Sequence, residues 1–154
     1  MVPTIPRNSN VLGSRIQYII GNPERFDLVI FHPPETSYSN GDQTWIKRVY
    51  GLPGEKIELE EGRIKIDGVV ITIPENLTYK DVEALRKPLP WITELKLGDS
   101  EYFLMGDNFD NSRDSRNLGA IKRNDIFAKV IKIMPLSDLP DKAEQDGGGK
   151  RDKQ

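Results

Sequence analysis

Cysteine is absent from this chain of 154 residues, and histidine occurs once, as His32. The lack of cysteine excludes disulfides, thiol catalysis and cysteine metal sites. A zinc site built from histidines needs several of them, and a single histidine before Pro33-Pro34 is more typical of a strand end than of a metal ligand or triad base. If the protein is a hydrolase, we therefore expect its base to be a lysine or a carboxylate. We expect no metal and no cofactor.

Long apolar runs and an excess of one charge are also lacking. No segment approaches the roughly 20 apolar residues of a membrane span, so the chain as given is expected to be soluble. Residues 1–6 have neither the basic start nor the apolar centre of a signal peptide. The 22 basic residues nearly balance the 24 acidic ones. This balance gives no electrostatic reason to expect nucleic acid as a partner.

Short segments rich in β-branched and aromatic residues, separated by turn signals, predict an all-β fold. Turns are expected at Glu61-Gly62 and Asp67-Gly68, within a meander of hairpins, and Asp81–Arg86 could form one short helix. The predicted strands cover residues 14–20, 26–31, 44–50, 56–72, 91–97, 102–105 and 126–134. We expect a core built by residues 1–56 and 102–135, a small β-rich insertion at 57–101 and a disordered tail at 136–154.

Lys47 occupies an unusual position in the strand TWIKRVY. Alternation places Lys47 on one face between the apolar Trp45 and Val49. Two interpretations follow. Lys47 and Arg48 could be a solvated pair on an edge strand, where lysine discourages aggregation. Alternatively, Lys47 is desolvated, its pKa falls, and it acts as a general base.

Residues 106–119, GDNFDNSRDSRNLG, form the most polar segment of the chain. They could be a long turn whose Asx and Ser side chains cap their own backbone. A calcium-binding EF-hand loop is excluded, because a frame starting at Asp107 puts Ser112 where glycine is required and Leu118 where glutamate is required. In extended chain Asp114 and Arg116 would share a face, where each could orient the other beside a site.

The segments IKRVYGLPGE (46–55) and FLMGDNFDNSRDSRNLG (103–119) together resemble the two most recognisable motifs of the bacterial type I signal peptidases. These Ser/Lys endopeptidases remove signal peptides from exported preproteins. Residues 1–5, MVPTI, resemble the family's first motif, Ser-Met-x-Pro-Thr-apolar, and residues 25–31, RFDLVIF, resemble the strand that follows it. The separation of about 45 residues between the two longer motifs resembles the compact enzymes of Gram-positive bacteria. The resemblance implies the signal-peptidase β-fold with a small hairpin insertion.

The resemblance also implies roles for individual residues. Lys47 matches the general base of the serine nucleophile, and Ser112 matches the residue whose hydroxyl orients that lysine. Asp114 and Arg116 match an ion pair beside the site, supported by Arg48 and Asp107. The residues expected to line a shallow pocket for a small P1 side chain are Met1, Ile5, Trp45 and Ile46.

The family's nucleophile is the serine directly before the Met-x-Pro-Thr motif, and this sequence begins at that methionine. We expect either a sequence that starts just after the nucleophile, with a membrane anchor further upstream, or a catalytically inactive binding module that assists surface-protein or pilus assembly. Phe109 stands where the family commonly has arginine, which is expected to affect a surface contact rather than the chemistry.

In complete form the protein is expected to be a membrane-associated serine endopeptidase, with this domain on the outer face of the cell membrane and signal peptides as its substrates. A second enzymatic interpretation is the related self-cleaving Ser/Lys peptidase domain of SOS-response repressors. Against it stand the absence of a DNA-binding helical module and of an Ala-Gly or Cys-Gly cleavage site before the domain.

Overall fold

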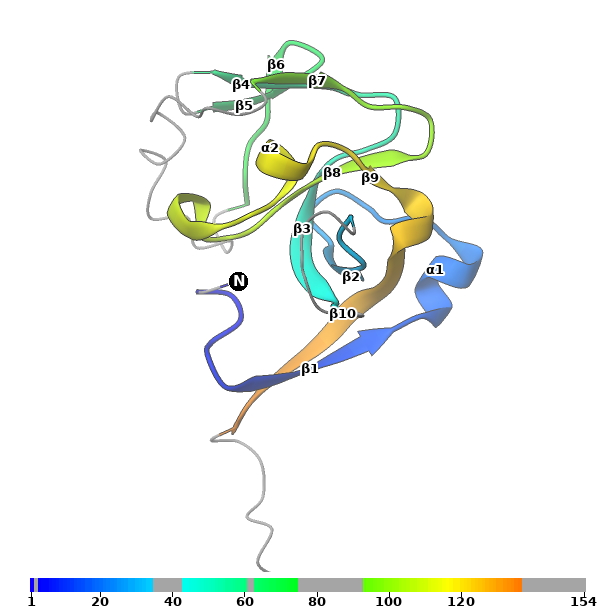
Figure 1. Ribbon diagram of the computed structural model, residues 1–154, viewed down its shortest axis with the longest axis vertical. Helices are drawn as coiled ribbons and strands as arrows, with labels where there is room; N and C mark the ends of the chain where they lie inside the picture. The colour runs from blue at the N-terminus through cyan, green and yellow to red at the C-terminus, as the bar shows by residue number, and fades with distance from the viewer. Residues whose placement is uncertain (2, 35–42, 61–62, 75–92, 137–154) are drawn as a thin grey trace, which may run out of the picture.

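The computed structural model describes residues 1, 3–34, 43–60, 63–74 and 93–136, and these residues form two antiparallel sheets. Figure 1 shows the smaller sheet at one end of the molecule and the larger sheet at the other. The larger sheet has the strand order β1-β10-β2-β3-β8-β9, and the smaller has the order β6-β5-β4-β7. The prediction of an all-β fold is confirmed.

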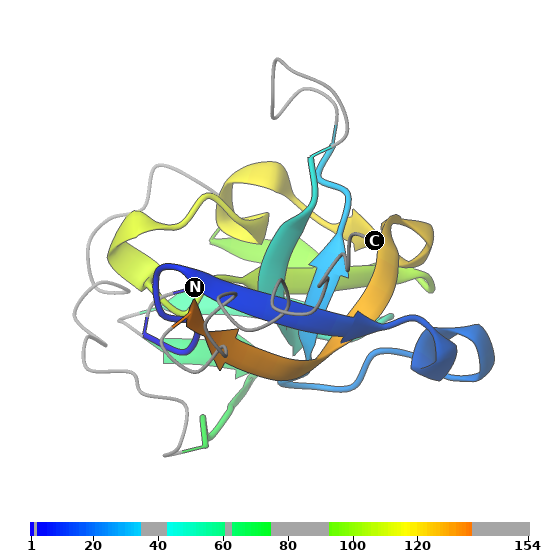
Figure 2. The same cartoon turned by 90° about the horizontal axis from the view of Figure 1, so that it is seen from below.

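The larger sheet is built from segments that are distant in the sequence. Its strands are β1 (Ser9–Ser14), β2 (Leu28–Phe31), β3 (Trp45–Gly51), β8 (Glu101–Met105), β9 (Ile121–Lys122) and β10 (Ile126–Pro135). The first and last of these, β1 and β10, pair along much of their length, and Figure 2 shows them running together along one side of the molecule. Strand β3 lies between β2 and β8, so it is an interior strand.

The smaller sheet consists of β4 (Lys56–Glu60), β5 (Arg63–Ile66), β6 (Val69–Val70) and β7 (Glu94–Lys96). The hairpin between β5 and β6 turns at Asp67 and Gly68, which both have positive φ angles, as the Asp-Gly signal predicts. The expected Glu61-Gly62 turn and Asp81–Arg86 helix lie outside the described residues. So does the expected disordered tail at 136–154, apart from Leu136, whose N–H donates to the Asn8 carbonyl at 3.0 Å. The division into a core and an insertion stays a prediction.

Residues 14–20 do not form the predicted strand. Their main part is a short helix, α1 (Ile16–Ile20), in which only Tyr18 is buried. The Tyr18 hydroxyl donates to Asp27 at 3.0 Å, and the Tyr18 carbonyl accepts a hydrogen bond from Arg123 at 2.6 Å. These contacts, one of them with a residue 105 positions away, override the β-propensity of the isoleucines, and Ile20 is 88% exposed.

Two apolar clusters form the core. One packs between the sheets and contains Tyr50, Ile57, Ile64, Ile66, Leu97, Phe103, Met105 and Phe109. The other lies on the opposite side of β3 and β8 and contains Tyr18, Val29, Phe31, Val49, Tyr102, Leu104, Ile121 and Ile126. Strands β3 and β8 therefore contribute side chains to both clusters, which fixes the backbone that carries Lys47. The polar segment after β8 contains the 3₁₀ turn η3 (Phe109–Asn111) and helix α2 (Ser115–Leu118). A second 3₁₀ turn, η4 (Arg123–Asp125), follows β9.

Candidate active site

Lys47 lies on the interior strand β3, where Val29 of β2 is its partner in register. Its ammonium nitrogen Nζ donates a hydrogen bond to Ser112 Oγ at 2.9 Å. The structure thus brings together the two residues that the sequence nominates as base and orienting hydroxyl. The alternative in which Lys47 and Arg48 are a solvated pair is wrong, because Arg48 is buried in an ion pair with Asp107 and the Lys47 amine is bonded to Ser112.

The surroundings of Lys47 disfavour its charged form. Its Nζ lies 5.8 Å from the centre of the Trp45 ring, a contact that by itself would favour the ammonium. Burial is the largest cause that lowers the pKa of Lys47 below its ordinary value, and Arg116 lowers it further, while Asp114 and Asp107 act in the opposite direction. A lysine whose pKa falls can be neutral nearer to physiological pH, which a general base requires.

Asp114 and Arg116 form a fully buried ion pair with two hydrogen bonds. Arg116 Nε donates to Asp114 Oδ1 and Nη2 donates to Oδ2, both at 2.8 Å. Asp114 is also the N-cap of α2, where its side chain accepts a bond from the Arg116 backbone N–H. The predicted proximity of the two residues is therefore present, but a helix N-terminus creates it rather than an extended strand.

Arg48 and Asp107 form a second buried pair below the site. Arg48 Nε and Nη2 donate to the two carboxylate oxygens of Asp107 at 2.9 and 2.8 Å, and Nη1 donates to the Phe26 carbonyl at 2.9 Å. A two-point contact of this kind fixes the direction of both side chains. It ties the start of the polar segment to β3, one residue after Lys47.

Gly106 is a site residue that the sequence analysis did not single out. Its backbone N–H donates to Asp114 Oδ2 at 3.0 Å. A Cβ atom added at this position would lie 2.1 Å from Ser112 Oγ and 3.3 Å from Lys47 Nζ. Only glycine therefore leaves room for the Lys47–Ser112 contact. A glycine at the junction of a buried strand and a polar segment was the available signal.

The expectation that residue 109 takes part in a surface contact is wrong. The Phe109 side chain is buried within the cluster between the sheets, with an exposed fraction of 6%. The Arg116 guanidinium lies over its ring, 5.4 Å from the centre. Phe109 is thus an apolar anchor next to Arg116.

The four residues nominated for a substrate pocket lie in two places. Trp45 and Ile46 are half-buried on β3 beside Lys47, whereas Met1 and Ile5 close a turn in which the Ile5 N–H donates to the Met1 carbonyl at 3.0 Å. Burial lowers the pKa of the Met1 amino group, and the nearby charge of Lys47 lowers it further. The pocket formed by all four residues stays a prediction.

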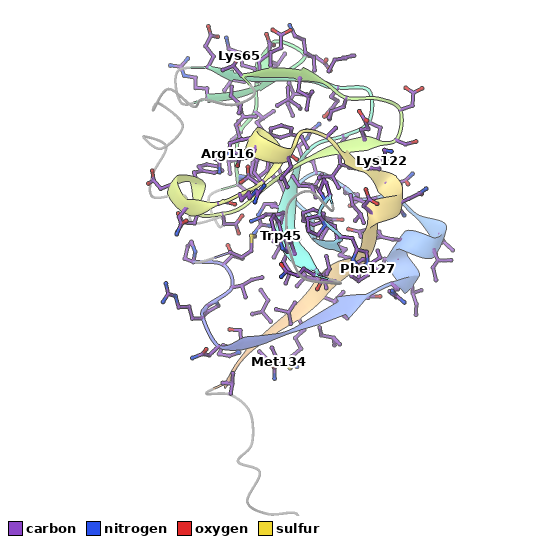
Figure 3. All side chains as sticks on the ribbon, in the orientation of Figure 1. Trp45, Lys65, Arg116, Lys122, Phe127 and Met134 are labelled. Atoms are coloured by element: carbon purple, nitrogen blue, oxygen red, sulfur yellow. The ribbon has the colours of Figure 1, made fainter. Side chains whose placement is uncertain are left out.

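Over the described ranges, no group of three or more His, Cys, Asp or Glu side chains is arranged to hold a metal ion. His32 stacks on Phe127, with 4.6 Å between the ring centres. In the same parts of the chain, no helix is both long and apolar enough to cross a membrane. Figure 3 shows Trp45 near the centre of the larger sheet and Arg116 between the two sheets.

Comparison with known proteins assigns the family. The profile of the family described as "Signal peptidase, peptidase S26" matches residues 1–134. The chain belongs to this family. It is 32% identical to signal peptidase I of Leptolyngbya laminosa over 143 residues, which cover 90% of this chain and 66% of that protein. It is 30% identical to signal peptidase I of Bacillus caldolyticus over 136 residues, which cover 84% of this chain and 71% of that protein.

The fold agrees with the family. The crystal structure of a signal peptidase I from Enterococcus faecalis V583 superposes with a TM-score of 0.53 at 28% identity, covering 73% of this chain and 99% of that one. The chain spans about two thirds of the length of the curated relatives that it matches. The resemblance to the bacterial type I signal peptidases is confirmed, and the comparisons favour it over the SOS-response repressors.

Proposed function

We propose that the protein is a serine endopeptidase that cleaves signal peptides from preproteins, with Lys47 as the general base. The observation that carries the proposal is the Lys47 Nζ to Ser112 Oγ hydrogen bond of 2.9 Å, in a site where burial lowers the lysine's pKa. A serine hydroxyl is inert until a nearby base accepts its proton, and a desolvated lysine can do so.

The nucleophile in this proposal is a serine directly before Met1 in the whole protein. The family resemblance supports that position. In this proposal the side chain of that serine lies within reach of Lys47. Ser112 would hold the lysine in the direction of that serine.

The reaction would proceed in two stages. Lys47 accepts the serine proton as the serine oxygen attacks the scissile carbonyl, and the resulting ammonium then protonates the departing amine of the mature protein. Lys47 is neutral again once this proton has left. It next accepts a proton from water, whose hydroxide attacks the ester and releases the signal peptide as a carboxylate. The proton returns to the serine oxygen.

The substrate would bind as an extended strand along β3. Strand β8 pairs with β3 from Arg48 to Gly51, so its pairing begins just beyond Lys47. The preceding residues Trp45 and Ile46 border the site and pair with β2 on their other side. A peptide added along this part of β3 would present its scissile bond to Lys47. Met1, Ile5, Trp45 and Ile46 would then contact the small side chain before the cut.

A membrane anchor upstream of this sequence would place the domain on the outer face of the cell membrane, beside the signal peptides that it cuts. This part of the proposal rests on the family. The alternative, an inactive binding module, would use the same surface but would not turn over its ligand. A cleavage assay therefore separates the two.

The assay uses the protein extended by a membrane anchor and a serine before Met1, with a preprotein that has alanine before its cleavage site. We expect cleavage at that site, and we expect Lys47→Ala to abolish it. Lys122→Ala is the matched control, because Lys122 is an exposed lysine on β9. If the extended protein that retains Lys47 binds the preprotein tightly but does not cleave it, the proposal is contradicted and the binding module is favoured.

A further inference from the structure

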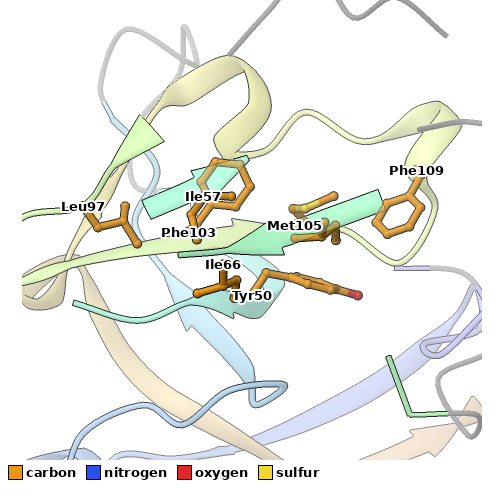
Figure 4. Packing of buried hydrophobic residues seen from close by; sticks show 8 residues of the cluster. Tyr50, Ile57, Ile66, Leu97, Phe103, Met105 and Phe109 are labelled. Carbon is orange, nitrogen blue, oxygen red and sulfur yellow. The ribbon is translucent and has the colours of Figure 1, made fainter. Parts of the chain in front are cut away.

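Phe109 stands out in the polar segment after β8 because its ring points into the apolar core. It is 6% exposed, and its ring centre lies 6.3 Å from that of Tyr50. Figure 4 shows Phe109 at the edge of the cluster. Met105 of β8 is the neighbouring labelled member, and the Tyr50 ring extends toward the same side. The side chain thus joins the active-site segment to the core between the two sheets.

Residue 109 holds Arg116 in two ways. The guanidinium lies 5.4 Å from the ring centre, and Nη1 donates to the Phe109 carbonyl at 2.9 Å. The Arg116 side chain is only 3% exposed. A cation over an aromatic face is held more strongly when water is excluded, and the Phe109 ring excludes it here.

The contacts continue from Arg116 to the proposed base. Arg116 binds both carboxylate oxygens of Asp114, and Asp114 Oδ2 accepts the Gly106 N–H. Gly106 in turn packs against Ser112 Oγ and Lys47 Nζ, with no room for a side chain between them. A displacement of Arg116 would therefore reach Lys47 through two intermediate residues, Asp114 and Gly106.

We propose that Phe109 is a positioning residue for Lys47, acting by seating Arg116 and by keeping water out from beneath the site. This inference rests on the proposed function of Lys47 as general base. The charged groups that act on Lys47 are Asp114 and Arg116 at α2 and Asp107 after β8. Phe109 contacts Arg116 directly and so influences the balance of charges that sets the pKa of Lys47.

Replacing the ring by a smaller aliphatic side chain would admit water and loosen Arg116. Hydration relieves the burial that is the largest cause of the lowered Lys47 pKa, and a displaced Arg116 repels the ammonium less. Both changes raise the pKa of Lys47. We expect an upward shift of about half to one pH unit, with the acidic limb of the rate profile moving by the same amount.

The test is a titration of the Lys47 amine by NMR in wild type, Phe109→Leu and Phe109→Met, with Lys47→Ala used to assign the signal. Phe103→Leu is the matched control, because Phe103 is a fully buried member of the same cluster. Its replacement makes a similar cavity away from Arg116. Phe109→Tyr retains the aromatic face. Phe109→Met has about the volume of the leucine variant but a longer, flexible side chain that can fill the space left by the ring, so it provides a folded variant if the leucine variant unfolds.

Higher Lys47 pKa values in the leucine and methionine variants of Phe109, with wild-type values in Phe109→Tyr and Phe103→Leu, would support the inference. Equal shifts from Phe109→Leu and Phe103→Leu would overturn it, because they would indicate a general loosening of the core. The titration does not depend on turnover. A failure of every protein to cleave preprotein would therefore count against the proposed function, while the pKa comparison would still decide the role of Phe109.

Discussion

Lys47 and Ser112 are separated by 65 positions in the sequence, and their side chains meet at 2.9 Å. The contact joins an interior strand to the polar segment that follows β8. Three features hold it in place: the glycine at position 106, the buried Asp114–Arg116 pair and the buried Arg48–Asp107 pair. Each feature can be removed separately by substitution.

Ser112→Ala removes the oxygen that accepts the Lys47 hydrogen bond. Lys47 would keep its position on β3 but lose the direction of its Nζ atom, so proton transfer to it would slow. We expect kcat/KM for preprotein cleavage to fall about 10²-fold or more, the range expected when general-base catalysis is impaired. Ser100→Ala is a control at an exposed serine. Unchanged kinetics in Ser112→Ala would show that the hydrogen bond has no part in catalysis.

The lowered pKa of Lys47 also has a consequence for stability. The folded protein binds fewer protons than the unfolded chain between the depressed pKa and the ordinary value of 10.5. Stability therefore rises with pH through this window, and the destabilising effect of the buried charge is greatest below the depressed pKa. We expect Lys47→Met, which removes the charge, to be more stable than wild type at low pH and to lose this advantage as the pH approaches 10.5.

Urea denaturation at several pH values measures this difference, and other titrating groups cancel in the comparison with wild type. Lys122→Met is the control, since an exposed lysine gains little from losing its charge. A stability difference between Lys47→Met and wild type that stays constant from neutral pH to pH 10.5 would contradict the lowered pKa.

Some of this site could be predicted because it depends on local patterns. Alternation along β3 is enough to put Trp45 and Lys47 on one face, and the 5.8 Å distance between the Lys47 amine and the Trp45 ring agrees with it. The Asp67-Gly68 hairpin follows from two residues that tolerate positive φ. In such cases neighbouring residues carry the information.

The features that the sequence did not reveal depend on distant contacts. The isoleucines of α1 favour a strand locally, but Tyr18 is held by Asp27 and by Arg123, which lies 105 positions away. The burial of Phe109 depends in the same way on the core between the two sheets, which no local pattern describes. Propensity cannot anticipate contacts of this kind.

Gly106→Ala tests the space around the site. The new Cβ would lie 2.1 Å from Ser112 Oγ, so the segment carrying Ser112 must move away from Lys47. We expect a loss of activity of about 10²-fold or more and a destabilisation of about 1–3 kcal/mol, as for other overpacked positions. Gly98→Ala is the control, because its Cβ would meet only the flexible end of the Glu101 side chain, at 3.1 Å. Normal activity in Gly106→Ala would show that the segment adapts without harm.

Arg48→Met would leave the Asp107 carboxylate buried without its partner. Both side chains are almost fully inaccessible, and the two hydrogen bonds between them measure 2.8 and 2.9 Å. Removing one partner of a buried pair costs about 3–5 kcal/mol, much of it from the charge left behind. We expect a loss of this size in the free energy of unfolding, measured by urea denaturation.

The double variant Arg48→Met with Asp107→Leu distinguishes the two contributions, because it removes the stranded charge as well. We expect it to recover much of the lost stability but little of the activity, since an apolar pair can fill the space without fixing the direction of the segment that leads to Gly106 and Ser112. Recovery of both would mean that the pair serves stability alone. Recovery of neither would mean that the packing around the pair requires these two side chains.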